Sequence, residues 1–221
     1  MARAIPGPTL LGFDELLAQA DQDSRKRRFD RLTSHLPSEM EAAIKHHRQQ
    51  IKDYDAAMMA GEWETALKIK REAHDMAVRV NHGEPGILAD RDSPGSVIAT
   101  RCAAKAGTVP RWGQQGRWTV SVEGDFTVGR KKGAGRWSSV DVMVDLDGMF
   151  GLASAYSAFP GFAARVVDAS KPFISATGYR SFLSGYGASK QPPATTADFV
   201  KRVIGDHIRL ELKNSLVMVK P

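Results

Sequence analysis

The fold class is decided by residues 38–81, which read SEMEAAIKHHRQQIKDYDAAMMAGEWETALKIKREAHDMAVRVN. In the first half, one face of a helix is marked by spacings of four and three residues: Met40, Ile44, His47, Ile51, Tyr54 and Met58. Ser38 and Glu41 have the spacing of a capping box, and Gly61 is placed to end the helix. The second half continues the helical spacing as far as Val80. Because the connection at Gly61 is short, we predict an antiparallel helical hairpin.

The segments on either side of the hairpin differ in character. Residues 13–36 also show helical spacing, and Ser24 could begin a second helix there, so one helix and two remain open. Residues 84–116 lose the helical period and contain Pro85, Pro94, Pro110 and several glycines. Such a stretch is typical of an irregular crossing between two structural parts.

Strand patterns begin at residue 117. Trp118, Val120 and Val122 alternate with polar residues, a turn is expected within 123–125, and Phe126 would start the returning strand of a hairpin. Residues 138–148, SSVDVMVDLDG, alternate again, and residues 159–167 are a candidate for another strand. A final helix is predicted after the N-cap residue Thr195. The chain is therefore predicted to be α+β, with a helical region (1–83, hairpin 38–81), a crossing (84–116) and a region with an antiparallel sheet and a closing helix (117–221).

Composition limits the class of protein. The hydrophobic fraction of 42% is enough for a packed core, and the single cysteine, Cys102, excludes a disulfide framework or a Cys-rich zinc module. The first residues lack the apolar run of a signal peptide, and Pro160 interrupts the apolar stretch 148–167. We therefore expect a cytoplasmic protein without membrane association.

The chain is basic, with a formal net charge of +6 and a pI of about 9.5. This charge permits nucleic acid or an acidic protein as partner. The glycine-rich loop GRKKGAGR supplies the predicted nucleic-acid contacts: Arg130, Lys131, Lys132 and Arg136. Trp118 and Trp137 flank this loop and could stack on bases, although buried tryptophans are commoner.

Three acidic residues lie on or next to one predicted strand: Asp141, Asp145 and Asp147. With Glu123 or Asp125 they could bind Mg²⁺ and serve a phosphodiester hydrolase. The favoured interpretation is that acids alternate with valines because one face of the sheet is wet. A second metal hypothesis joins His47 and His74 across the helical hairpin, against the simpler view of hydrogen-bonded histidines.

Residues 171–187, KPFISATGYRSFLSGYG, are rich in hydroxyl groups and glycine. An anion pocket could form from a cap, a glycine and an arginine: Ser175, Thr177, Gly178 and Arg180. The favoured alternative is a structural corner, with a helical turn near Gly178, buried Tyr179, Phe182 and Leu183, and Arg180 paired with an acid such as Asp168.

Several segments together resemble a known family: LDGMFG (146–151), KPFISATGYRSFL (171–183) and DFVKRVIGDHIRLELK (198–213). The segments LLGFDELLAQAD and EPGILA extend the likeness over most of the chain. They resemble a bacterial protein family associated with plasmids and integrative elements. The resemblance implies an accessory role on a mobile genetic element and supplies no activity.

Two classes of function follow. The favoured one is a non-catalytic accessory or regulatory protein that binds nucleic acid or a partner protein through basic surface, without a cofactor. The alternative is a metal-dependent hydrolase centred on Asp141, Asp145 and Asp147. No nucleophile–base pair is visible in the sequence, so no catalytic residue is assigned. Convergence of the three acids in one pocket would favour the hydrolase.

Overall fold

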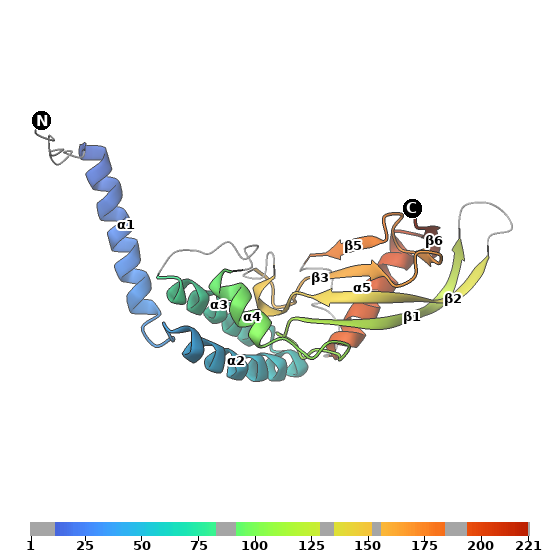
Figure 1. Ribbon diagram of the computed structural model, residues 1–221, viewed down its shortest axis with the longest axis horizontal. Coiled ribbons are helices and arrows are strands. Elements are labelled where there is room, and N and C mark those ends of the chain that lie inside the picture. Colours follow the sequence, from blue (N-terminus) through green and yellow to red (C-terminus); the bar gives the residue numbers. More distant parts are fainter. Residues whose placement is uncertain (1–11, 83–91, 129–134, 152–155, 184–193, 221) are drawn as a thin grey trace, which may run out of the picture.

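A computed structural model describes residues 12–82, 92–128, 135–151, 156–183 and 194–220. The helices are α1 (Phe13–Leu32), α2 (Met40–Ala60), α3 (Trp63–Val80), α4 (Pro94–Arg101), the 3-10 helix η1 (Gly148–Phe150) and α5 (Thr196–Leu210). The strands are β1 (Gly116–Val128), β2 (Arg136–Leu146), β3 (Phe162–Val166), β4 (Pro172–Phe173), β5 (Tyr179–Phe182) and β6 (Ser215–Met218). The predicted α+β class is confirmed, with helices first, then the sheet, and α5 near the C-terminus (Figure 1).

One sheet holds all six of these strands, in the order β4-β6-β1-β2-β3-β5. Neighbouring strands are antiparallel except β1 and β6, which are parallel. Apolar even-numbered residues in the middle of β1 and β2, such as Val120 and Val142, are buried on the side that α5 covers. We call the opposite side, with Arg117, Asp145, Arg165 and Tyr179, the outer face of the sheet.

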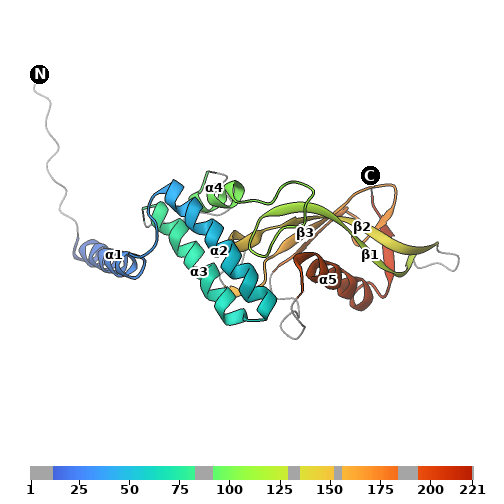
Figure 2. The ribbon, with the colours of Figure 1, turned by 90° about the horizontal axis from the view of Figure 1, so that it is seen from below.

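The predicted helical hairpin is confirmed. Helices α2 and α3 lie side by side and run antiparallel (Figures 1 and 2), and Gly61 ends α2 with a left-handed φ of 76°. The predicted capping box is wrong, because α2 begins one residue later and its N-cap is Glu39, without a side-chain cap bond. Ser38 therefore lies outside the helix. In residues 13–32 the chain forms a single helix through Ser24, and it projects away from the rest of the molecule in both views.

The predicted hairpin within residues 117–128 is wrong. Strand β1 continues through this stretch and pairs with β2, and the register shifts between Glu123 and Phe126 as at a β-bulge. Gly124 is placed there because an added Cβ would lie 2.5 Å from the Phe126 ring. Residues 84–116, predicted to be irregular, contain α4, which Ser93 caps by accepting a bond from the Ser96 N–H. The domain bounds drawn from the sequence stay a prediction.

The hairpin packs against the sheet through the segment that follows β2. Tyr54 donates its hydroxyl to the carbonyl of Ala158, and α3 and α4 both contact η1. Trp63 and Phe159 place their ring centroids 5.0 Å apart across the same boundary. Within the described residues, no helix has both the length and the apolar character needed to cross a bilayer.

Candidate nucleic-acid interface

Two arginines on the outer face are held by one carboxylate. Arg117 of β1 donates its Nε to Oδ1 of Asp145 on β2, and Arg165 of β3 donates its Nε to Oδ2 at 2.8 Å. Cross-strand pairing brings the three side chains together. Arg117 of β1 lies directly opposite Asp145, and Arg165 of β3 lies diagonal to Asp145, two residues beyond its direct partner Ala163. Partial burial raises the pKa of Asp145, but the hydrogen bonds from the two arginines outweigh it, so its pKa lies below the ordinary value.

Both guanidinium groups remain open to solvent. The side chains of Arg117 and Arg165 are 63% and 50% exposed, while Asp145 is only 23% exposed. Each arginine uses Nε to bind Asp145, which fixes the planar group while its outer edge faces water. Arg165 also lies over the Tyr179 ring, with the guanidinium carbon 4.9 Å from the centroid. We call Arg117, Asp145 and Arg165 the arginine clamp.

Two adjoining cavities open beside the arginine clamp. The larger, of about 500 Å³, is lined by Arg117, Asp145 and the segment after α4. The smaller, of about 280 Å³, is lined by Tyr179, Ser181 and Phe150, and we call it the tyrosine cavity. Gln115 and Asp147 line both cavities, so these two polar side chains lie at the boundary between them.

Asp147 is held in a closely packed position. Its backbone N–H donates to the carbonyl of Gly161 at 3.1 Å. A Cβ added at Gly151 or Gly161 would lie 2.8 or 2.9 Å from Oδ2 of Asp147, so both glycines make room for the carboxylate. Burial raises the pKa of Asp147 to about 6, an effect that the nearby Lys70 ammonium opposes.

Lys70 of α3 is fully buried behind this carboxylate. Its Nζ donates to the carbonyls of Ser157 and Phe159 at 3.0 and 3.3 Å. Burial lowers the pKa of Lys70 to about 7, and the charge of Asp147 opposes this change. The α2–α3 hairpin therefore supplies the Lys70 amino group, which donates to the loop before β3 and interacts electrostatically with Asp147.

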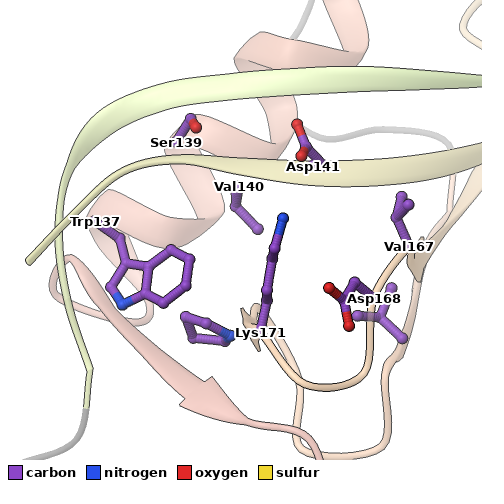
Figure 3. Close-up of a pocket in the computed structure, with 9 residues that line it drawn as sticks. Trp137, Ser139, Val140, Asp141, Val167, Asp168 and Lys171 are labelled. Atoms are coloured by element: carbon purple, nitrogen blue, oxygen red, sulfur yellow. The ribbon is translucent and has the colours of Figure 1, made fainter. Parts of the chain in front are cut away.

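The three acids of the hydrolase hypothesis do not share a pocket. Asp145 and Asp147 line the 500 Å³ cavity, whereas Asp141 lines a separate one of about 80 Å³. Figure 3 shows this small pocket, where the Lys171 side chain extends between Trp137 and Asp168 toward β2. Across the described part of the chain, no group of three His, Cys, Asp or Glu residues has a metal-binding arrangement.

The predicted basic loop is only partly described. Arg130, Lys131 and Lys132 lie outside the described residues, between β1 and β2 in the sequence. Arg136 begins β2, is exposed and pairs with Asp125 at 3.4 Å. Of the two flanking tryptophans, Trp118 is 3% exposed and belongs to the core, so it offers no stacking surface, and Trp137 is half-buried.

The polar side chains of the hypothetical anion pocket all bond to other protein groups. Ser175 and Thr177 join their hydroxyl groups at 2.8 Å, and Gly178 takes a left-handed φ of 69° in the turn before β5. Arg180 lies on the inner side of the sheet and pairs with Glu211 at 3.4 Å. The anion pocket stays a prediction, with its arginine already engaged.

The favoured corner interpretation is right only in part. Arg180 does pair with an acid, but that acid is Glu211 and not the suggested Asp168, which instead accepts bonds from Ser170. The expected helical turn is strand β5, because the chain pairs with β3. Phe182 is buried, but alternation turns Tyr179 and Leu183 outward, and they are 42% and 54% exposed.

The two hairpin histidines lie close together, as the spacing predicts, with Phe150 between them. Their rings stand 4.9 and 5.4 Å from the Phe150 ring, and each binds a protein atom. His47 pairs with Gln50 at 3.3 Å, and His74 with the Met149 carbonyl at 2.8 Å. Burial lowers the pKa of His47 to about 4, which favours the neutral ring and the simpler, structural interpretation.

Sequence reasoning missed the arginine clamp. Arg117, Arg165 and Tyr179 lie on three different strands, and only the sheet register brings them together. The usable signal was the alternation of side chains along a strand. Arg117 lies next to Trp118, which shares the apolar face with Val120, so the Arg117 side chain had to face outward.

Comparison with known proteins gives two bacterial relatives. An Escherichia coli protein called Protein KlcB is 32% identical over 153 residues, which is 68% of this chain and 33% of the relative. Another Escherichia coli protein of the same name is 35% identical over 96 residues, covering 43% of this chain and 17% of the relative.

The relatives are bacterial. This supports the bacterial part of the resemblance seen in the sequence. The chain spans about a third or less of the length of these curated relatives. No protein-family model matches the chain, and no solved structure matches it.

Proposed function

We propose that this chain is a non-catalytic accessory protein of a mobile genetic element that binds nucleic acid through the outer face of its sheet. The observation that carries the proposal is the arginine clamp, in which Asp145 of β2 fixes two exposed guanidinium groups from the strands on either side, β1 and β3. Arginine suits phosphate because its planar donors match two oxygens at once.

Other features of the chain support the same partner. Tyr179 adds an exposed aromatic ring, which can stack on a base of a single strand. The whole chain is basic, and the predicted contacts Arg130, Lys131 and Lys132 follow β1 directly in the sequence. Such a surface would hold the phosphate backbone without reading the sequence of a duplex.

The test is binding of a fluorescent single-stranded oligonucleotide across salt concentrations from about 50 to about 200 mM. Changing Arg117→Gln and Arg165→Gln together should reduce the slope of log affinity against log salt by roughly 1.4 units, at about 0.7 per lost contact. Adding Asp145→Asn to this pair removes the carboxylate that would otherwise lose its partners, and it should give the same slope.

The matched control changes Lys201→Gln and Arg209→Gln, which remove two exposed charges from α5. This variant should keep the wild-type slope. An equal loss of slope in the control would show that net charge matters and the clamp does not. Absence of binding at the lowest salt would refute the nucleic-acid proposal.

The alternative, a metal-dependent hydrolase, has less support. Asp145 already accepts bonds from two arginines, and Asp141 lies in a different cavity from Asp145 and Asp147. A metal site at Asp145 would have to displace both guanidinium groups first.

A further inference from the structure

We infer that the outer face binds single-stranded nucleic acid with one unpaired guanine inserted in the tyrosine cavity, against Asp147 and Gln115. This inference rests on the proposed function and adds the identity of the base. It joins three observations: a cavity of suitable size, a polar pair at its boundary, and the arginine clamp, whose Arg165 lies over the Tyr179 ring.

The cavity is suited in size to one base. Its volume of about 280 Å³ is just below the ~300 Å³ at which pockets for drug-sized ligands begin. Tyr179, Phe150 and Phe162 give it aromatic walls, and Tyr179 remains 42% exposed, so a flat ring can enter and stack.

The phosphate backbone of the nucleic acid has a place to bind next to this cavity. Arg165 contacts the Tyr179 ring on one side and the Asp145 carboxylate on the other, so it links the tyrosine cavity to the arginine clamp. A phosphate on the clamp would leave its base within reach of the cavity. A base still stacked in a duplex could not enter, so the ligand is an unpaired strand.

The polar pair selects guanine by its hydrogen-bonding edge. A carboxylate only accepts hydrogen bonds, through two oxygens, and guanine presents two adjacent donors, N1–H and the exocyclic amine. The Gln115 amide can donate to the guanine O6 oxygen. Adenine and thymine each place an acceptor beside their donor on this edge, and that acceptor would face the Asp147 oxygens.

The position of Asp147 is fixed well enough to discriminate. Gly151 and Gly161 confine its carboxylate, and its backbone is bonded to Gly161. Lys70 lies buried near it, and its charge opposes the rise in the pKa of the carboxylate that burial causes.

The experiment compares oligothymidylates of about 15 nucleotides that carry dT, dG, dA or deoxyinosine at the centre, by fluorescence anisotropy at low salt. The dG oligonucleotide should bind roughly tenfold more tightly than the all-dT one, as expected for one bidentate base contact. Deoxyinosine lacks the exocyclic amine and should fall between dG and dT, while dA should match dT.

Asp147→Asn should abolish the dG-over-dT ratio, because the amide replaces one acceptor by a donor. Asp141→Asn is the matched control: it makes the same chemical change on β2, the strand that Asp147 directly follows, but in the separate small pocket, and should keep the ratio. Thermal melting of both variants shows whether each is folded.

The outcomes separate the two proposals. Equal affinity of the wild type for dG and dT oligonucleotides would overturn the guanine site and leave the proposed function standing. A dG preference that survives Asp147→Asn in a folded protein would also overturn the guanine site. No binding of any oligonucleotide at low salt would overturn the proposed function, and the guanine site with it.

Discussion

At the scale of single residues, the most informative side chain is Lys70, a lysine with no exposed surface. It shares a helix face with Ala66 and Ala73, where the sequence predicts an apolar core. Periodicity marks the position as inward-facing but cannot show what satisfies the ammonium. Its acceptors are the carbonyls of Ser157 and Phe159, more than eighty residues further along the chain. Such partners become visible only when the tertiary structure is known.

Because of Lys70, the stability of the fold should change with pH in the alkaline range. Its pKa is lowered to about 7 in the folded protein from 10.5, so between these values the unfolded chain binds the extra proton. The free energy of unfolding should therefore rise with pH in this window, by at most about 1.4 kcal/mol per pH unit. Urea denaturation from about pH 7 to about pH 9.5 measures the rise, which should be missing in Lys70→Met.

Lys68→Met is the control for this prediction, because Lys68 lies on the same helix with an exposed side chain. It should keep the wild-type pH dependence. The same rise in Lys70→Met as in the wild type would show that another group causes it.

At the scale of helices and strands, local signals predicted some elements and misled on others. The α2–α3 hairpin and the Thr195 cap of α5 follow from spacing and capping chemistry, which act within a few residues. Gly124 looks the same in sequence whether it forms a turn or a bulge, and only pairing with β2 decides between them. Strand β6 is four residues long and depends on its neighbours β1 and β4, so it carried no usable pattern.

The hairpin assignment predicts the effect of a charge in its seam. Ile51 is 4% exposed, so Ile51→Asp would bury a carboxylate among apolar side chains and should cost several kcal/mol of stability. Thermal or urea denaturation measures the loss. Ala56→Asp adds the same charge at an exposed position of α2 and should change stability little. Wild-type stability of Ile51→Asp would contradict the packing of α2 described above.

At the scale of the whole molecule, the sequence predicted the class of the fold and which residues of β2 face inward, but not the candidate site. The clamp needs the register of three strands, and the cavities beside it also need the segment after α4 and the turn after β2. The predicted basic loop is a property of local sequence and could be named at once.

The predicted basic loop and the arginine clamp are expected to bind one continuous nucleic-acid strand. If Lys131 and Lys132 contact phosphates, changing both to Gln should reduce the salt slope for a single-stranded oligonucleotide by roughly 1.4 units. Combined with Arg117→Gln and Arg165→Gln, the reductions should add to roughly 2.8 units, because well-separated contacts release counterions independently. A control pair, Arg25→Gln and Arg28→Gln on α1, should leave the slope unchanged. A normal slope in the loop variant, together with a reduced slope in the α1 variant, would move the contact from the loop to the basic end of α1.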